Sequence, residues 1–169
     1  KVSLPGGCAI SSRPIDLHLN ALKKMGAKIK IKNGYVVASA AKGLKGCFIK
    51  FSKISVGATE NILIASCFAN GKTRLRNCAL EPEVKDLITF LKKLGCLISF
   101  VGKRDIDVIG IKELGSAKHK VIFDRIEAGT YIIASALTNG RLKIKNIDPK
   151  IMPTEIKTLN KMGVRIIKK

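Results

Sequence analysis

One cysteine lies in a glycine-rich stretch near the start of the chain, Pro5-Gly6-Gly7-Cys8-Ala9-Ile10. Glycine and proline disfavour both helix and strand, so this stretch is predicted to form a loop. Arg13 follows at the expected start of a helix. A thiol beside backbone N–H groups and a cation can ionise and react, whereas a thiol packed in an apolar core is inert. The spacing therefore indicates a reactive Cys8 with a cationic neighbour.

A second polar group comes just before an apolar stretch and consists of Lys53, Ser55, Val56 and Gly57. Backbone N–H groups at the start of a helix can bind a diphosphate, and a glycine there permits close approach. Lys53 would add a point charge. The alternative interpretation is an ordinary helix start with Ser55 as its N-cap.

Two sequence patterns repeat along the chain with a period of about 70 residues, which indicates repeated structural units. The first pattern occurs at residues 22–29, 91–98 and 159–166, each time with a glycine in the same place. The second pattern begins with Asn-Gly and occurs at residues 70–77 and 139–146. Each unit is predicted to run helix, strand, helix, strand.

The first helix of each unit, at Ile62–Ala69 and Tyr131–Leu137, is apolar nearly all round and is expected to be buried on all sides. Short strands are predicted at Thr73–Arg76 and Leu142–Lys145. The second helix is amphipathic and is expected to end at Gly95. Its apolar stripe consists of Val84, Leu87, Ile88, Leu91 and Leu94. These patterns predict a mixed α/β fold of repeated units packed about buried helices.

The chain has 169 residues, of which 46% are hydrophobic, so it can form a sizeable core as one domain or as parts of two. Its net charge of +20 raises nucleic acid or a membrane surface as partners. The basic residues are spread along the whole chain, however, and aromatic residues make up only 5%. A solvated lysine-rich surface is therefore the simpler interpretation, although a basic cleft would also attract phosphorylated small molecules.

The five cysteines indicate neither a metal site nor a disulfide framework, because their number is odd and no two have the CxxC spacing. Cys67 lies in an apolar helix and Cys96 begins an apolar strand, so both are predicted to pack in the core. This usage fits a reducing, cytoplasmic setting. The longest apolar stretch is too short to cross a bilayer, and no secretory signal opens the chain.

Together these motifs resemble those of the enolpyruvyl transferases, the EPSP synthase-like family. The resemblance covers the whole chain and rests on residues 5–10, 13–18, 53–60, 81–83 and 124–127. Three positions depart from the family pattern: Ser11 replaces a usual glycine, Leu80 an arginine and Ala128 a threonine.

The resemblance implies a fold of two inside-out α/β barrels, each built from three repeat units, with a cleft between them. Residues 1–122 would be the later part of the barrel that carries the catalytic loop, and residues 123–169 would begin the second barrel. Family members are more than twice as long, and the chain opens with Lys1, so we expect it to begin in the middle of a longer protein.

The resemblance also implies a reaction. The enolpyruvyl group of phosphoenolpyruvate moves to the 3-hydroxyl of UDP-N-acetylglucosamine and phosphate leaves, in the first committed step of peptidoglycan synthesis. No cofactor or metal is implied, and the expected partners are these two small molecules, with no nucleic acid or membrane. The enzyme is expected to be a monomer in the bacterial cytoplasm. The family's base and the arginines that hold phosphoenolpyruvate have no match here, so this segment alone is expected to be inactive.

By resemblance, Cys8 is the active-site cysteine: a general acid, a covalent partner of phosphoenolpyruvate and the target of fosfomycin. Arg13 matches an arginine that contacts the bound substrates, and a guanidinium suits phosphate. The alternatives are a small buried hydrophobe for Cys8 and a solvated surface residue for Arg13.

Pro14, Asp16 and Leu17 match the stretch that holds the uracil ring, and His18 could touch substrate. Asp16 could equally be a first-turn acid that complements the helix dipole, and His18 could be an ordinary helix residue. In the family, the segment with Lys53, Ser55, Val56 and Gly57 lies against the UDP diphosphate. Four acidic residues match family positions without an assigned catalytic role: Glu81, Glu83, Asp124 and Glu127.

Three other functions stay open. The related shikimate-pathway transferase shares the implied fold but lacks the cysteine loop. An inactive paralogue could still bind UDP-sugars. A basic nucleic-acid-binding protein would need clustered cations or interleaved aromatic residues, which this sequence does not have.

Overall fold

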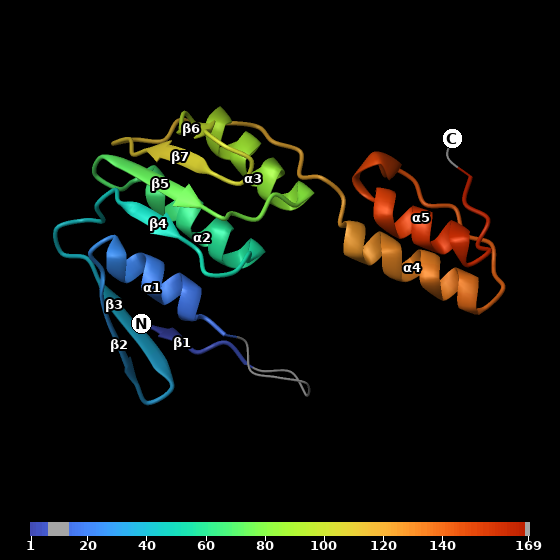
Figure 1. The fold of residues 1–169 in the computed structure, drawn as a ribbon, viewed down its shortest axis with the longest axis horizontal. Coiled ribbons are helices and arrows are strands. Elements are labelled where there is room, and N and C mark those ends of the chain that lie inside the picture. The colour runs from blue at the N-terminus through green and yellow to red at the C-terminus, as the bar shows by residue number, and fades with distance from the viewer. Residues whose placement is uncertain (7–13, 168–169) are drawn as a thin grey trace. The chain divides into compact units, whose positions relative to one another are not determined.

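The computed structural model describes residues 1–6 and 14–167. They form two compact units, a larger unit at Lys1–His119 and a smaller unit at Lys120–Lys169 (Figure 1). The assignment of residues 1–122 and 123–169 to two barrels stays a prediction.

The described residues of the larger unit form two sheets and three helices (Figure 1). A three-stranded antiparallel sheet has the order β1-β3-β2, and a four-stranded sheet has the order β4-β5-β7-β6. Strands β4 and β5 are parallel, and the other pairs of the second sheet are antiparallel. The elements in chain order are β1 (Val2–Ser3), α1 (Asp16–Lys24), β2 (Lys28–Lys32), β3 (Tyr35–Ser39), β4 (Phe48–Lys50), α2 (Val56–Cys67), β5 (Lys72–Arg76), α3 (Pro82–Lys93), β6 (Leu97–Phe100) and β7 (Ile106–Ile109).

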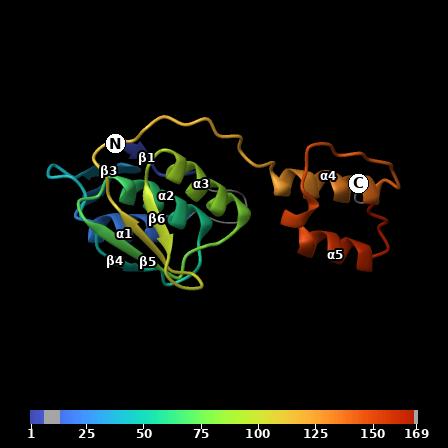
Figure 2. The ribbon, with the colours of Figure 1, turned by 90° about the horizontal axis from the view of Figure 1, so that it is seen from above.

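Helix α2 lies between α1 and α3 in both ribbon views and also packs against β7 of the four-stranded sheet (Figures 1 and 2). Ala58, Ile62 and Leu63 on this helix are fully buried. The core extends from them to α1, α3 and the inner face of the four-stranded sheet. Burial of these apolar side chains is the main stabilising contribution to the unit.

The expectation that this apolar helix is buried on all sides is only partly right. Ile64 is 50% exposed and Phe68, which caps the helix, is 53% exposed. Helices α1 and α3 and the sheet pack on the other sides, and this side remains half-exposed among the described residues. A helix with apolar residues on all sides is expected to be covered on all sides. The described residues cover this helix only in part.

The second helix of the repeat follows its sequence closely. Val84, Ile88 and Leu91 of the predicted stripe are buried on α3, which begins with Pro82. Gly95 has φ +100°, the left-handed conformation that ends a helix, and β6 follows it. Asn139 ends its helix in the same way at φ 52°, whereas α2 already ends at Cys67, three residues before Asn70.

The smaller unit contains α4 (Arg125–Leu137), a 3₁₀ turn (Pro149–Ile151) and α5 (Pro153–Lys161). Its buried core is small and centres on Ala128, Met152 and Ile156. The predicted strand at Leu142–Lys145 is wrong, because no described residue pairs with this segment and a lone strand has no stability of its own. Helix α4 is also not buried all round, since Leu137 is 81% exposed.

Two neighbouring isoleucines of α2 test how much the fold depends on this helix. Ile62→Ala should lower the free energy of unfolding by about 2–5 kcal/mol, because it leaves a cavity in the core. Ile64→Ala, at the exposed position of the same helix, should change it by less than about 0.5 kcal/mol. Urea unfolding followed by circular dichroism measures both, and equal losses would show that the core is not centred on α2.

Candidate functional site

The predicted site residues fall into three segments of the chain. Cys8 and Arg13 lie outside the described residues. Pro14 precedes the start of α1, and Asp16, Leu17 and His18 open that helix. The segment from Lys53 to Gly57 leads into the start of α2.

The start of α2 is a capped helix N-terminus. Ser55 is the N-cap in an extended conformation, and its side-chain oxygen accepts a hydrogen bond from the Ala58 N–H at 3.3 Å. The Thr59 hydroxyl donates to the Ser55 carbonyl at 2.8 Å. This confirms Ser55 as a cap, and the helix begins directly after it at Val56, six residues before the apolar stretch from which it was predicted.

Lys53 and Gly57 are both exposed, so the lysine charge and the glycine backbone are accessible to solvent. The N-terminus of a helix carries a partial positive charge. The Val56 side chain packs against the core and would offer a ligand only its backbone. The segment thus has what a diphosphate needs: helix N–H groups, an exposed glycine and a cation two residues before the helix cap.

The start of α1 is held against the start of α2 through His18. The Asn61 side-chain amide lies 3.1 Å from His18 Nδ1. A Cβ added at Gly57 would lie 3.6 Å from His18 Cε1. The structure therefore brings together two predicted segments that are far apart in sequence.

Asn61 is a site residue that the sequence analysis missed. It lies four residues after Gly57, one turn further along α2, and so shares a face with it. The four-residue spacing between Gly57 and Asn61 could have indicated that Asn61 lies near the site. It does so only once α1 is known to lie beside α2.

The remaining residues of α1 have separate environments. Asp16 is exposed in the first turn, which fits a charge that complements the helix dipole. Pro14 is also exposed. Leu17 is partly buried against the core. The dipole role of Asp16 does not exclude contact with a ligand.

Acidic residues near the start of α3 interact with α2. Burial raises the pKa of Glu60, and the nearby charge of Glu83 raises it further. Glu81 has a buried carboxylate oxygen, Oε2, for which no described residue supplies a hydrogen bond. These three carboxyl groups place negative charge near α2, whereas Lys53 contributes a positive charge before its first turn.

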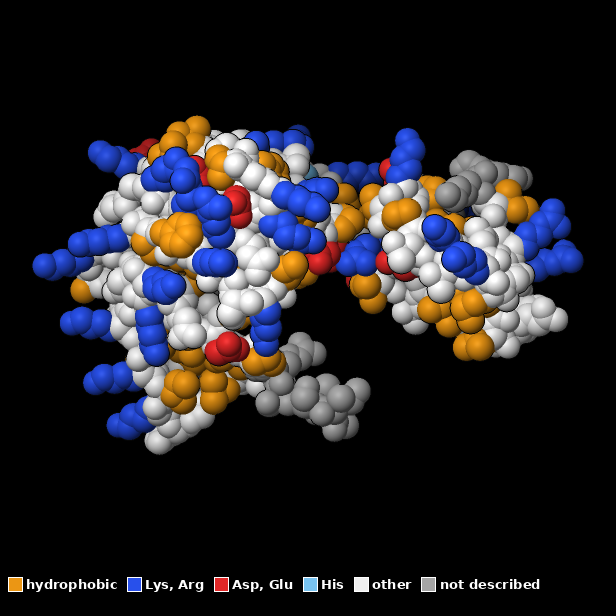
Figure 3. Space-filling view, in the orientation of Figure 1, with side chains coloured by type: hydrophobic (Ala, Val, Ile, Leu, Met, Phe, Trp, Pro, Cys, Tyr) orange, Lys and Arg blue, Asp and Glu red, His pale blue; other side chains and the backbone are white. Residues whose placement is uncertain are grey.

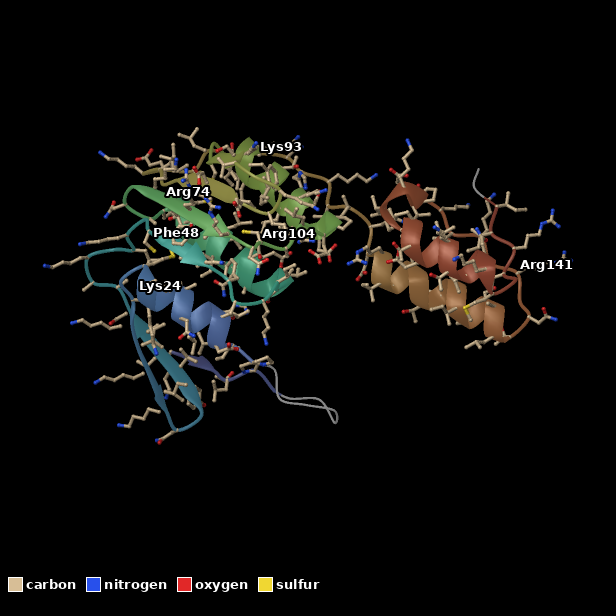
Figure 4. The ribbon with its side chains drawn as sticks, in the orientation of Figure 1. Lys24, Phe48, Arg74, Lys93, Arg104 and Arg141 are labelled. Carbon is tan, nitrogen blue, oxygen red and sulfur yellow. The ribbon has the colours of Figure 1, made fainter. Side chains whose placement is uncertain are left out.

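The four described cysteines are free thiols, and in three of them burial raises the pKa and so disfavours the thiolate. Burial raises the pKa of Cys67 and of Cys78 to about 12, and Cys96 also contributes at Cys67. Burial raises the pKa of Cys47 as well, while Lys24, labelled in Figure 4, lowers it in part. Cys67 and Cys96 are buried, as predicted. Because the thiolate is the reactive form, the prediction of a reactive cysteine rests on Cys8.

The described residues include neither a candidate metal site nor a candidate membrane-spanning helix. They contain no group of three or more His, Cys, Asp or Glu side chains that could hold a metal ion. None of their helices has both the length and the apolar character needed to span a bilayer.

The comparison with protein families decides where the chain belongs. The family model described as EPSP synthase (3-phosphoshikimate 1-carboxyvinyltransferase) matches residues 1–169. The chain belongs to this family. A relative from Pelagibacter ubique named UDP-N-acetylglucosamine 1-carboxyvinyltransferase is 59% identical over 98% of the chain. A relative of the same name from Endomicrobium trichonymphae is 49% identical over 98% of the chain. The chain spans 40% of the length of each.

Solved structures confirm the fold of this family member. The enolpyruvyl transferase NikO from Streptomyces tendae matches with a TM-score of 0.77 at 23% identity, covering 94% of this chain and 41% of its own. EPSP synthase from Acinetobacter baumannii matches with a TM-score of 0.66 at 21% identity, covering 89% of this chain and 35% of its own. The predicted mixed α/β, enolpyruvyl-transferase-like fold is therefore correct.

The cap at the start of α2 can be tested alone. Ser55→Ala should lower the free energy of unfolding by about 1 kcal/mol, because the Ala58 N–H loses its acceptor, whereas Ser55→Gly should cost only a few tenths. Ser116→Ala, in an exposed loop, is the matched control and should have no effect. Urea unfolding measures all three, and a Ser55→Ala value equal to the control would contradict the capping role.

Proposed function

We propose that this chain is part of a UDP-N-acetylglucosamine 1-carboxyvinyltransferase. The observation that carries the proposal is the identity of 45–59% over 98% of the chain with relatives of that name. The reaction would transfer the enolpyruvyl group of phosphoenolpyruvate to the sugar 3-hydroxyl and release phosphate, for peptidoglycan synthesis. The active protein would be a monomer in the bacterial cytoplasm.

In this proposal the starts of α1 and α2 form the nucleotide-sugar site. The diphosphate lies against Gly57 and the first N–H groups of α2, with Lys53 supplying a charge. The uracil ring lies at Pro14, Asp16 and Leu17, where a carboxylate or a main-chain group accepts its N–H. The 3.1 Å contact between Asn61 and His18 supports this arrangement, because it holds the two helix starts beside each other.

The chemistry would proceed by addition and elimination. In the addition, the sugar oxygen bonds to the central carbon of phosphoenolpyruvate while an acid protonates the methylene carbon and a base takes the hydroxyl proton. In the elimination, the C–O bond to phosphate breaks and the methyl carbon loses a proton. Cys8 would be the acid and the residue that fosfomycin modifies, with Arg13 on the substrate phosphates.

The shikimate-pathway enzyme is the nearest competitor, because the matched family model bears its name. The solved EPSP synthase is 21% identical to this chain, which is evidence about fold alone. The higher identity of the UDP-N-acetylglucosamine enzymes and the Cys8 loop both favour the proposed function over it.

Binding of UDP-N-acetylglucosamine tests the nucleotide-sugar site. Lys53→Ala should weaken binding by about 5- to 10-fold in isothermal titration calorimetry, because one charge on the diphosphate is lost. Lys112→Ala, an exposed lysine outside the site, is the control and should bind like the wild-type chain. No binding at millimolar ligand, or equal loss in both variants, would contradict a uridine diphosphate site at α2.

Phosphate release tests whether this segment can catalyse the reaction. With both substrates present, the 169-residue chain should release no phosphate above background, because no base or phosphoenolpyruvate-binding arginine is assigned within it. A coupled phosphate assay at high protein concentration measures this. Clear turnover would show that the chain holds a complete active site.

Nucleotide-sugar binding without turnover fits both a piece of an active enzyme and an inactive paralogue. The same phosphate assay on a longer form of the protein separates these two possibilities.

A further inference from the structure

The outer face of the four-stranded sheet is basic along β4 and β5. Along β5, Thr73 and Leu75 are buried against the helices, so Lys72, Arg74 and Arg76 point to the opposite face. The space-filling view shows Lys and Arg side chains gathered over this part of the sheet (Figure 3). The alternation of β5 thus places its three cations on one side.

Strand β4 adds an aromatic ring and another cation to this face. Its register pairs Phe48 with Arg74 and Lys50 with Arg76. Figure 4 shows Phe48 and Arg74 on these neighbouring strands. Phe48 is 55% exposed, and the Arg76 guanidinium lies 6.0 Å from the centre of its ring. A half-exposed ring beside cations is suited to stacking with a planar ligand.

The face is hollowed where β4, β5 and the β6–β7 turn meet. An open depression of about 640 Å³ lies there, a volume typical of small-molecule sites. The side chains that line it and bear on the argument are Phe48, Lys50, Arg76, Lys103, Arg104 and Asp105. Four cations and one anion leave this lining with a net positive charge.

The walls of the depression are fixed by hydrogen bonds. Arg104 donates from Nη1 to the Cys78 carbonyl at 3.0 Å, and its own carbonyl accepts the Cys78 N–H at 2.9 Å. Arg76 pairs with Asp105 at 2.9 Å. Asn77, which also lines the depression, donates to the Phe51 carbonyl at 3.0 Å. The turn and the ends of both strands are therefore held in place before any ligand binds.

The positive charge is least compensated at this depression. Further along the face, the buried Asp107 pairs with both Lys72 and Arg74, which reduces the field there. In the depression, Lys50 and Lys103 form no ion pair with any described residue. Uncompensated cations next to one exposed ring match a ligand that carries phosphates and a flat base.

We propose that this depression binds a nucleoside di- or triphosphate. The phosphates would contact Lys50, Lys103 and Arg104, and the base would stack on Phe48. The site shares no residue with the segment from Lys53 to Gly57, so it is separate from the nucleotide-sugar site proposed above.

ATP without metal is the probe, and calorimetry on the full chain is the measurement. UDP-N-acetylglucosamine is present in excess, so that ATP cannot be bound at the start of α2. Lys50→Ala combined with Lys103→Ala should weaken ATP binding at least 10-fold, and binding should fall steeply with added salt. Lys112→Ala combined with Lys118→Ala changes the net charge equally at exposed positions and should lower the affinity less than 2-fold.

The ring is tested separately. Phe48→Ala should weaken ATP binding about 5-fold or more. Phe100→Ala removes a similarly exposed ring, 47% exposed on β6, and should have no effect. Circular dichroism and thermal unfolding check that each variant is folded, and a cross-peak shift at Asn77 in ¹⁵N-labelled protein would place ATP in the depression.

Several outcomes would overturn the proposal. Absence of ATP binding would do so, as would equal effects of the paired variants. Equal affinity for tripolyphosphate and ATP would show a site for phosphate alone. Affinity for a single-stranded oligonucleotide that grows with its length would show a nucleic-acid surface instead. If UDP-N-acetylglucosamine does not bind, it cannot block the start of α2, but the paired Lys50 and Lys103 variant and the Asn77 cross-peak still show whether ATP is in the depression, so the two proposals fail independently.

Discussion

Burial of helix α2 is the constraint on which the larger unit depends. An apolar helix needs neighbours on most sides, and α1, α3 and the four-stranded sheet supply them. The fully buried Thr59 then fixes the helix start: its hydroxyl donates to the Ser55 carbonyl and accepts the Ala79 N–H at 3.0 Å. Because the segment after β5 and the start of α2 share this hydroxyl, packing of the core also sets the position of the candidate diphosphate site.

The features that could be predicted from the sequence are those that depend on nearby residues. The Ser55 cap, the buried stripe of α3 and the left-handed Gly95 each follow from a few neighbouring positions. The exposure of Ile64 and the missing strand at Leu142–Lys145 could not be predicted in this way, since both depend on which partners lie beside them. A hydrophobic pattern indicates which face of an element should be buried, and only the tertiary structure shows whether other elements cover that face.

The same limit applies to the candidate sites. Asn61 and His18 lie 43 positions apart, and their contact exists only because α1 packs on α2. In sequence, the cations are spread evenly, which favoured a solvated lysine-rich surface. Folding gathers some of them, because Lys50 and Arg76 are register partners and the β6–β7 turn brings Arg104 to them. Charge distribution is thus a property of the fold that composition does not reveal.

A single short connection separates the two proposed sites. Strand β4 carries Phe48 and Lys50 on the outer face of the sheet, and the chain then runs through Phe51 to Lys53 and α2. Phe51 is buried, its N–H donates to the Arg76 carbonyl at 3.1 Å, and its carbonyl accepts from Asn77 at 3.0 Å. A residue held at both backbone groups moves little without breaking those bonds. The connection therefore ties the end of β4, which carries Lys50, to the segment that carries Lys53 and leads into α2.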